Sequence, residues 1–426
     1  MPAALDDLAT ARRDQRPVGI TSVCSAHPLV IRAALRLARK SGETALIEAT
    51  CNQVNHRGGY TGLQPADFVA LVMRIAGEEG CSKNRIVLGG DHLGPNPWRD
   101  RAAREAMAEA REMVAAYIRA GFRKIHLDAS MPCADDPPTL VDAVIAERAA
   151  DLARVAEETA QTAGGEMPRY IIGTEVPPPG GANHSLDTVP PTDPGSARQT
   201  IDIHRQTFAR AGLDDAFARV LAVVVQPGVE FGNRDVVRYD RVAAQPLADV
   251  LGDYPTLVFE AHSTDYQGRA PLTELVADGF AILKVGPELT FALREALYGL
   301  DIIASDMLPD YGDRPLFHAM ERTMLADPAN WERHYHGPAS ELRVLRHYGL
   351  TDRIRYYWPV PDAVRAVRRL TDALEGQCIP LPLMWQHLPA AVEFAEQPLD
   401  AEALVIWRIS QSLKSYHDAC HPAASN

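Results

Sequence analysis

The chain has 426 residues, 46% of them hydrophobic, which is enough for one large domain or a domain with an extension. Its formal net charge of -13, without a basic run or a basic–aromatic ladder, argues against nucleic acid or an acidic membrane surface as a partner. Six scattered Cys without a CxxC pair indicate reduced thiols, and a polar, acidic N-terminus with no apolar run of ~18 residues predicts a cytoplasmic protein without a membrane span.

Eight short apolar runs follow one another along the chain, each ending in small or polar residues. Most lack strict apolar–polar alternation, which is typical of strands covered on both faces. Helical patterns fill the gaps between them. The predicted strands span residues 18–27, 44–53, 85–92, 124–130, 169–176, 220–228, 256–263 and 281–286. The predicted helices span residues 28–40, 67–79, 99–120, 142–162, 196–211, 241–251 and 272–278.

Strand and helix alternating eight times predict an α/β fold of the (β/α)₈ TIM-barrel type. A doubly wound open sheet is the alternative. It usually has fewer strands and often a Gly-rich phosphate turn after the first one, whereas the first run here ends in Ser25-Ala26-His27 without GxGxxG. The pattern therefore favours the barrel.

Beyond residue 300 the pattern changes to charged helical stretches with aromatic residues and a last helix near residues 401–416. We predict a barrel domain over residues 1–300 and a helical C-terminal extension over residues 301–426, packed on the barrel. The extension could also be the contact of a homo-oligomer. The Pro-rich segment 176–194 follows the fifth strand, and a loop of that length is usually a lid, a binding loop or disordered.

Polar residues end every predicted strand. In a barrel of this kind the active site lies at the C-terminal ends of the strands, so these residues are candidate site residues. A single carboxylate there often only caps the next helix, and a lone His is more often structural. Eight polar ends converging on one rim favour a site instead. The candidates are, strand by strand, Ser25 and His27; Glu48, Asn52 and Gln53; Asp91 and His92; His126, Asp128 and Ser130; Thr174 and Glu175; Gln226 and Glu230; Glu260, His262 and Ser263; and Lys284 and Gly286.

The residue types at this rim point to a divalent metal. His92 and His262 are nitrogen ligands of the kind that Zn²⁺ takes, and Glu260 faces the same way as His262 because it lies two residues before it. Gln226 or Glu175 is an alternative to Glu260 for completing the ligand set. Mn²⁺ or Mg²⁺ replaces Zn²⁺ as the expected metal if oxygen ligands dominate.

The same rim offers groups for proton transfer and for anion binding. A metal on a ketose carbonyl acts as a Lewis acid, and Asp91 or Glu175 can then take or return a proton. Lys284 and Ser263 follow strands where barrels often hold phosphate, although Lys284 could instead form a Schiff base. His126 is expected deeper in the barrel. The predicted catalytic residues are Asp91, Glu175, Glu48 and Asp128, the metal ligands are His92, Glu260, His262 and Gln226, and the substrate or phosphate contacts are Ser25, Asn52, Ser263 and Lys284.

The segments IVLGGDHLGPNPW, AGFRKIHLDAS, YIIGTEVPPPGGA and LKVGPELTFALREAL resemble one family, named for the non-catalytic subunit of class II D-tagatose-1,6-bisphosphate aldolase. The resemblance runs from about Gly19 to the last helix and implies a TIM barrel. Some members are D-tagatose-6-phosphate 4-epimerases that make D-fructose 6-phosphate. Older labels call members tagatose-6-phosphate kinases, but this sequence has no GxxxxGK[ST] or other ATP motif.

The family is also a distant relative of the catalytic class II aldolases. Asp91 and His92 look like the catalytic Asp and zinc His that follow strand three of those aldolases, and Glu175 looks like their Glu after strand five. Gln226 and Gly286 fall where they have a zinc His and a phosphate-binding Asn. These departures argue against ordinary three-His aldolase chemistry, but they leave a metal site in place.

The aldolases' other zinc His, after strand seven, falls at Glu260 or His262, and the resemblance leaves both open.

Three functions fit these observations. The first is a metal-dependent enzyme on a ketose phosphate, which inverts C4 of D-tagatose 6-phosphate by cleaving and re-forming the C3–C4 bond. The second is a non-catalytic subunit that stabilises a separate class II aldolase in galactitol or N-acetylgalactosamine breakdown. The third is an aldolase or epimerase of an unphosphorylated sugar. We expect the first.

Overall fold

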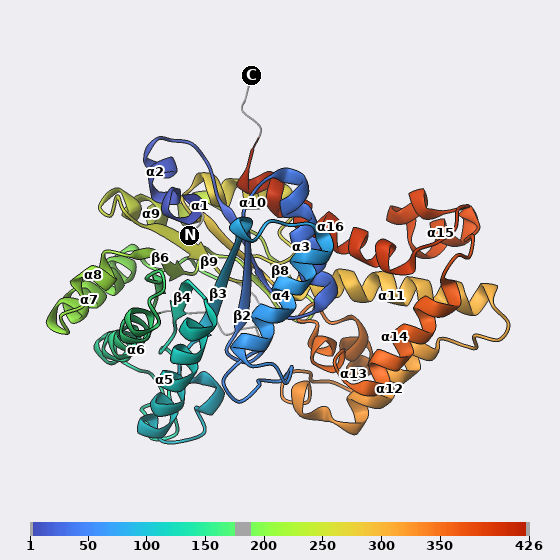
Figure 1. Cartoon of the computed structure of the whole chain (residues 1–426), viewed down its shortest axis with the longest axis horizontal. Helices are drawn as coiled ribbons and strands as arrows, with labels where there is room; N and C mark the ends of the chain where they lie inside the picture. Colours follow the sequence, from blue (N-terminus) through green and yellow to red (C-terminus); the bar gives the residue numbers. More distant parts are fainter. Residues whose placement is uncertain (1–2, 175–188, 423–426) are drawn as a thin grey trace.

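The computed structural model describes residues 3–174 and 189–422, which form a closed barrel with helices around it. Eight parallel strands pair in the order β1-β10-β9-β6-β5-β4-β3-β2 (Figure 1). Each predicted apolar run coincides with one of them, β3 extending one residue further, which confirms the (β/α)₈ barrel. The strands are β1 (Ile20–Cys24), β2 (Ala45–Thr50), β3 (Ile86–Leu93), β4 (Lys124–Leu127), β5 (Arg169–Ile172), β6 (Val220–Val225), β9 (Val258–Ala261) and β10 (Ile282–Val285).

Helices alternate with the strands and cover the outside of the barrel (Figure 1). The pattern at residues 241–251 is a helix only to Ala248, and a 3₁₀ turn follows it. The structure also contains a short antiparallel hairpin that the sequence did not predict, formed by β7 (Glu230–Phe231) and β8 (Val236–Val237). The helices up to the last strand are α1 (Ala3–Asp6), α2 (Leu8–Arg13), α3 (Pro28–Ser41), α4 (Pro65–Glu79), α5 (Ala103–Ala120), α6 (Asp142–Ala163), α7 (Pro194–Arg210), α8 (Asp214–Phe217), α9 (Arg241–Ala248) and α10 (Arg269–Ala277).

The barrel interior is apolar toward its N-terminal end and charged toward its C-terminal end. Side chains two positions apart on a strand point the same way, so Leu46 of β2 lies in the apolar layer and Glu48 in the charged layer above it. Leu5 and Leu8 of the two N-terminal helices pack into the same apolar cluster as Leu46. The charged groups therefore lie above an apolar layer that fills the N-terminal end of the barrel, and they face the C-terminal rim.

The C-terminal helices lie to one side of the barrel, and the last one returns to it (Figure 1). Helix α16 packs against α3, α10 and α11, and the Gly19 amide donates to the Cys420 carbonyl over 2.9 Å. The predicted division at residue 300 falls inside α11 and stays a prediction. These helices are α11 (Pro287–Met307), α12 (Pro315–Ala326), α13 (Ala339–Tyr348), α14 (Pro361–Leu374), α15 (Leu381–His387) and α16 (Ala401–Cys420).

A buried ion pair joins Asp352 to α11, the helix that follows the last barrel strand. The Asp352 carboxylate accepts hydrogen bonds from Arg294 Nε, over 2.9 Å, and from the Thr290 hydroxyl, over 2.7 Å, both on α11. It directly precedes the 3₁₀ turn η5 (Arg353–Tyr357). The pair therefore fixes this turn over the rim. Within residues 3–174 and 189–422, no helix has the length and apolarity needed to cross a membrane.

Candidate active site

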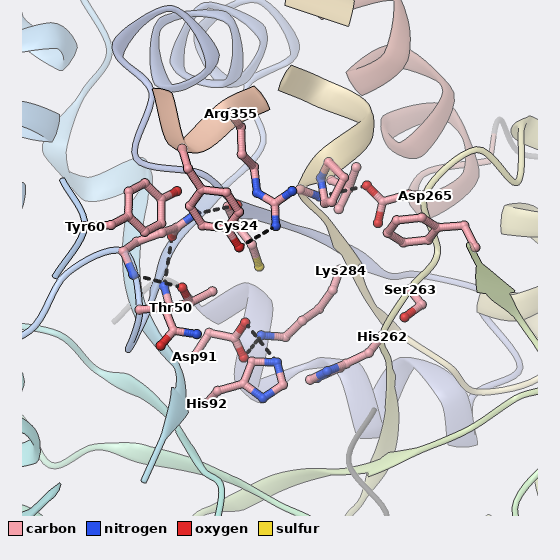
Figure 2. Close-up of a pocket in the computed structure, with 17 residues that line it drawn as sticks. Cys24, Thr50, Tyr60, Asp91, His92, His262, Ser263, Asp265, Lys284 and Arg355 are labelled. Carbon is pink, nitrogen blue, oxygen red and sulfur yellow. Dashed lines mark hydrogen bonds and ion pairs between the residues drawn. The ribbon is translucent and has the colours of Figure 1, made fainter. Parts of the chain in front are cut away.

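A pocket of about 620 Å³, counting its open mouth, lies at the C-terminal rim of the barrel (Figure 2). Strand ends supply its floor, including Asp91, His92 and Lys284. Arg355 and Tyr356 of η5 close its other side. The pocket is where a (β/α)₈ fold places catalytic groups, because all eight strands end there.

Asp91 and His92 are adjacent in sequence, yet both line this pocket. Neighbours on a regular strand point to opposite faces. Here the pairing of β3 with β4 gains an extra residue between Gly90 and Leu93, and His92 adopts a positive φ of 51°. Such a bulge redirects a side chain and is common beside active sites. The bulge explains how one stretch delivers a carboxylate and an imidazole to the same site.

Gly89, on the same stretch, makes room for a carboxylate from the neighbouring strand. A Cβ at Gly89 would lie 2.7 Å from Glu48 Oε1, which is too close for any real side chain. Glu48 and Lys124 flank Gly89 in register across β2, β3 and β4. Glu48 Oε1 thereby reaches Lys124 Nζ at 2.6 Å, and the same ammonium lies 2.6 Å from Glu260 Oε2.

Lys284 lies at the centre of the charged layer. Its ammonium pairs with Glu48 over 2.6 Å, with Glu260 over 3.4 Å, and with Asp91. Burial lowers the pKa of Lys284, but the surrounding negative charges, above all Asp91, outweigh burial and raise that pKa well above its ordinary value. The side chain is therefore a protonated ammonium at neutral pH, not a free amine.

Three imidazoles gather beside these charges. The ring centroids of His92, His126 and His262 lie 5.0, 5.0 and 5.2 Å apart. Asp128 holds His92 Nδ1 at 2.8 Å, and Glu260 holds His262 Nε2 at 2.9 Å. Burial lowers the pKa of His262 to about 3, so this ring is neutral and can donate a lone pair.

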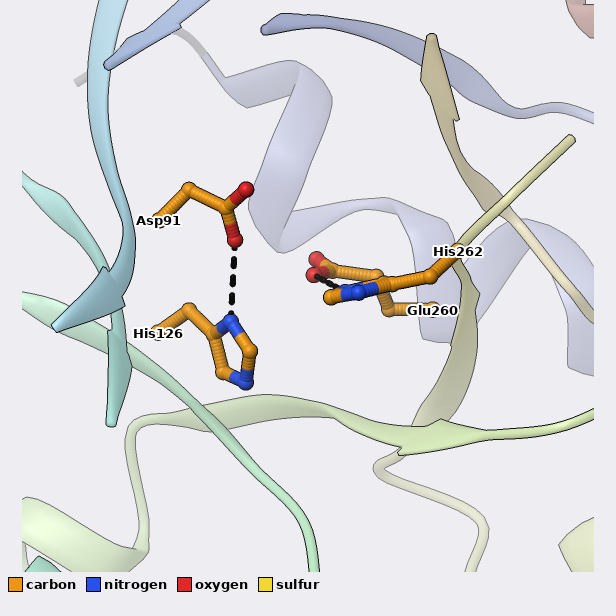
Figure 3. Close-up of side chains that lie close together, drawn as sticks. All are labelled: Asp91, His126, Glu260 and His262. Atoms are coloured by element: carbon orange, nitrogen blue, oxygen red, sulfur yellow. Dashed lines mark hydrogen bonds and ion pairs between the residues drawn. The ribbon is translucent and has the colours of Figure 1, made fainter. Parts of the chain in front are cut away.

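The donor set fits a divalent cation. Ligand atoms of Asp91, His126, Glu260 and His262 lie within 4.8 Å of one another (Figure 3). His126 Nε2 is buried and has no hydrogen-bond partner among the described residues. Four buried carboxylates face two buried ammonium groups in this layer, so it carries excess negative charge that a cation would offset. A mixture of imidazole nitrogens and carboxylate oxygens suits Zn²⁺.

The other predicted residues have four different placements. Asn52 and Ser263 line the pocket. Ser25 lines the adjoining pocket, and Gln226 supports its own loop, because its side-chain oxygen accepts from two backbone amides at 2.8 Å each. Glu175 lies outside the described residues. Gln226 therefore lies outside the metal-type cluster found among the described residues, which contains His126, and its predicted role as a ligand stays a prediction.

The sequence interpretation did not include Lys124, Arg355 and Tyr356. Lys124 lies two positions before the predicted residue His126 on β4, so a charged residue at position 124 of an apolar run was a usable signal. Arg355 and Tyr356 gave none, because they reach the rim from a distant, irregular segment. These two residues make the pocket a joint product of the barrel and the extension.

The strand ends of this closed (β/α)₈ barrel gather acids, bases and metal-type ligands around one pocket. This combination is typical of the (β/α)₈-barrel enzymes. Similarity to known proteins identifies the family within that class. The chain belongs to the D-tagatose-1,6-bisphosphate aldolase subunit GatZ/KbaZ-like family, whose sequence model matches residues 5–421.

Two relatives are similar over nearly the whole chain. A D-tagatose 6-phosphate 4-epimerase of Agrobacterium fabrum (strain C58 / ATCC 33970) is 58% identical over 422 residues, which are 98% of this chain and 99% of the relative. A crystal structure from Sinorhizobium meliloti 1021, named as a probable tagatose 6 phosphate kinase, is 50% identical with a TM-score of 0.86. It covers 94% of this chain and 100% of its own.

A third similarity is distant and shows the fold alone. The fructuronate-tagaturonate epimerase UxaE of Cohnella laeviribosi is 13% identical, with a TM-score of 0.50. The match covers 94% of this chain and 81% of that one.

Proposed function

We propose that this chain converts D-tagatose 6-phosphate to D-fructose 6-phosphate by inverting C4. The observation that carries the proposal is one pocket holding an ionised carboxylate, Asp91, against a buried ammonium, Lys284, beside a set of metal-type ligands. The epimerase that is 58% identical over nearly its full length supports the choice of substrate.

C4 cannot be inverted by removing its hydrogen, because that hydrogen lies β to the C2 carbonyl and is not acidic. Cleavage of the C3–C4 bond is the available route. The C4 hydroxyl loses its proton, the C3–C4 electron pair moves toward C2, and an aldehyde forms at C4. The aldehyde rotates, the same bond forms on its other face, and the proton returns to the C4 oxygen. Atoms and electrons balance without a further reactant.

Asp91 is the proposed proton acceptor for the C4 hydroxyl. Burial raises its pKa, but His92 and Lys284 outweigh burial and hold that pKa well below its ordinary value. The carboxylate is therefore ionised, which is the form that accepts a proton. Lys284 keeps that carboxylate ionised through its ion pair, and as an ammonium it has no lone pair for a Schiff base.

A divalent metal is the proposed cofactor, with Zn²⁺ expected first and Mn²⁺ or Mg²⁺ as alternatives. His126, Glu260 and His262, three of the four residues whose ligand atoms lie within 4.8 Å of one another, would hold it, and His92, whose ring centroid lies 5.0 Å from those of His126 and His262, is the further predicted ligand. Asp91, the fourth member of that group, is assigned to proton transfer. When bound, the cation would act as a Lewis acid on the ketose oxygens. Asp128 orients the His92 ring whether or not a metal is bound, because the Asp128 carboxylate lies 2.8 Å from His92 Nδ1.

Two other functions have weaker support. A non-catalytic aldolase subunit has no need for buried charges converging on one pocket, which the structure nevertheless maintains at the expense of desolvation. A kinase would need a cradle for nucleotide phosphates, and the sequence has no GxxxxGK[ST] motif. We therefore do not transfer the kinase activity in the name of the Sinorhizobium meliloti structure to this chain.

The test is an assay of the purified chain alone. It is incubated with D-tagatose 6-phosphate, with added Zn²⁺ or Mn²⁺ and with chelator, and D-fructose 6-phosphate is measured through a coupled dehydrogenase. We expect product with metal and none with chelator. If no D-fructose 6-phosphate forms under any metal, release of triose phosphates from D-tagatose 1,6-bisphosphate only after a class II aldolase subunit is added would favour the partner-subunit alternative. Consumption of ATP with formation of a bisphosphate would favour a kinase.

A further inference from the structure

The substrate of the proposed function carries a phosphate, and the two places where a barrel would usually hold it are already filled. Lys284 is surrounded by Asp91, Glu48 and Glu260, so its charge is already compensated. The N-terminus of α11 is occupied by the Asp265 side chain, which accepts from the Gly286 amide over 3.0 Å and from the Glu288 amide over 2.8 Å. A phosphate at either place would meet a carboxyl group.

Arg355 is the remaining strong cation of the pocket. Its Nη2 donates to the Tyr356 hydroxyl over 2.9 Å, and its Nη1 donates to the backbone carbonyls of Thr351 and Asp352. No carboxylate within the described ranges forms an ion pair with it, whereas the buried arginines Arg294 and Arg346 each pair with one. Its charge is therefore available to a ligand.

The position of Arg355 suits the far end of a sugar phosphate. Figure 2 shows its guanidinium across the pocket from Asp91 and His92. Tyr60 and Tyr356 stand next to it, with ring centroids 4.6 Å apart in an edge-on contact. A ligand whose reacting carbons lie at Asp91 would extend its other end toward this side.

We infer that Arg355, with the Tyr356 hydroxyl beside it, binds the 6-phosphate of the substrate and sets the preference for phosphorylated sugars. The inference rests on the proposed function for the identity of the sugar. A guanidinium matches phosphate oxygens through two parallel hydrogen bonds, which a lysine ammonium cannot make.

The electrostatics of the neighbouring tyrosine agree with this role. Burial raises the pKa of the Tyr356 hydroxyl, but the positive charges of Arg355 and Arg353 outweigh burial and lower that pKa overall. The η5 side of the pocket is therefore positive, whereas the barrel floor carries the excess carboxylates. A ligand with an anionic end and a neutral end is oriented by this contrast.

The experiment compares Arg355→Met and Arg355→Lys with the unmodified chain. Dissociation constants for D-fructose 6-phosphate, D-fructose and inorganic phosphate are measured by calorimetry, together with KM and kcat for D-tagatose 6-phosphate. We expect Arg355→Met to weaken D-fructose 6-phosphate binding about 100-fold and to abolish phosphate binding, while the dissociation constant for D-fructose stays unchanged. Arg355→Lys should recover part of the loss. Arg368→Met, exposed on α14 away from the pocket, is the control and should behave as the unmodified chain.

The outcomes separate this inference from the proposed function. Arg355-dependent phosphate binding in a chain without epimerase activity would leave the inference standing and remove the proposed function. An active epimerase whose preference for the phosphorylated sugar survives Arg355→Met would overturn the inference alone. Equal losses for D-fructose and D-fructose 6-phosphate would also overturn it, because they indicate general damage to the pocket.

Discussion

The role proposed for Asp91 depends on where its carboxylate lies more than on its being an aspartate. The β-bulge at His92 turns the Asp91 carboxylate onto Lys284 and His126, where it stays ionised in a buried setting. A carboxylate in such a place is costly unless its charge is used or compensated. Here the charge is compensated by Lys284 in the resting protein, and the carboxylate accepts a proton during the proposed reaction.

Replacing Asp91 by Asn tests that assignment, because an amide cannot accept the C4 proton. We expect Asp91→Asn to lower kcat by about 100-fold or more, the usual contribution of a general base, with metal content unchanged. Steady-state kinetics and elemental analysis measure the two quantities. Asp310→Asn, an exposed carboxylate on the extension, serves as the control. Full activity in Asp91→Asn would remove the proposed role.

His126 is the residue at which structure and sequence interpretation part. The sequence predicted that His126 lies deeper in the barrel, but not that a bulge in the neighbouring strand β3 brings His92 within reach of its ring. Spacing along one strand is a local property, whereas the His92–His126–His262 group depends on register between strands. Register of this kind was not readable from one sequence.

We expect His126→Gln to weaken Zn²⁺ binding at least about tenfold, a loss that removal of a supporting group alone can cause at metal sites. The dissociation constant is measured by competition with a chelating dye. His204→Gln is a matched control, because His204 is also fully buried and its Nε2 has no hydrogen-bond partner in the described part of the chain, but it lies in α7 outside the cluster. Equal zinc affinity in both variants would mean that His126 is not a ligand.

At the scale of elements, the strands were the most predictable part of the chain. Buried parallel strands read as continuous apolar runs, and each of the eight runs coincides with a strand. Helix ends were less predictable. Helix α5 begins at Ala103, four residues after the predicted start, because a 3₁₀ turn at Asn96–Trp98 precedes it. Helix α11 has an N-terminal cap, Asp265, that lies far from it in sequence.

That cap makes stability depend on pH. Burial raises the pKa of Asp265 to about 7, although the backbone amides it accepts from oppose the shift. As the pH rises from about 4 to about 7, the unfolded chain loses this proton while the folded chain keeps it, so stability falls. The effect is of the order of 4 kcal/mol, at about 1.4 kcal/mol per pKa unit.

We therefore expect the melting temperature of Asp265→Asn, relative to the unmodified chain, to increase as the pH rises across this range, because Asn does not ionise. Thermal unfolding in metal-free buffer between pH 4 and pH 8 measures the difference. Asp240→Asn removes an exposed cap from α9 and is the control. A difference that is constant with pH would show that Asp265 titrates normally.

At the scale of the whole molecule, the barrel and the extension form one working unit. The sequence change beyond residue 300 predicted an extension packed on the barrel, but no pattern in it predicted that η5 would reach the rim. Contacts between distant, irregular segments have no periodic signature. Helix α16 also makes the barrel depend on the extension. It packs on α3, α10 and α11 and covers helix surfaces that would otherwise face water.

Deleting residues 401–426 should therefore abolish folding rather than trim an appendage. Helix α16 buries a long apolar face, including Leu404, Ile409 and Leu413, against the barrel helices. We expect the shortened chain to be insoluble, or to melt at least about 10 °C lower, by circular dichroism. Arg408→Ala breaks a surface ion pair of the same helix with Glu295 and should cost under about 1 kcal/mol. A soluble, cooperatively folded deletion would contradict the one-unit account.

The central claim is that the rim pocket inverts C4 by breaking and re-forming the C3–C4 bond. D-tagatose 6-phosphate deuterated at C4 is incubated with the metal-loaded protein, and the product is followed by NMR. The account predicts D-fructose 6-phosphate that retains deuterium at C4, because the hydrogen on C4 never leaves its carbon. Loss of the label to solvent would contradict the cleavage mechanism, and the absence of product under every metal would contradict the proposed function.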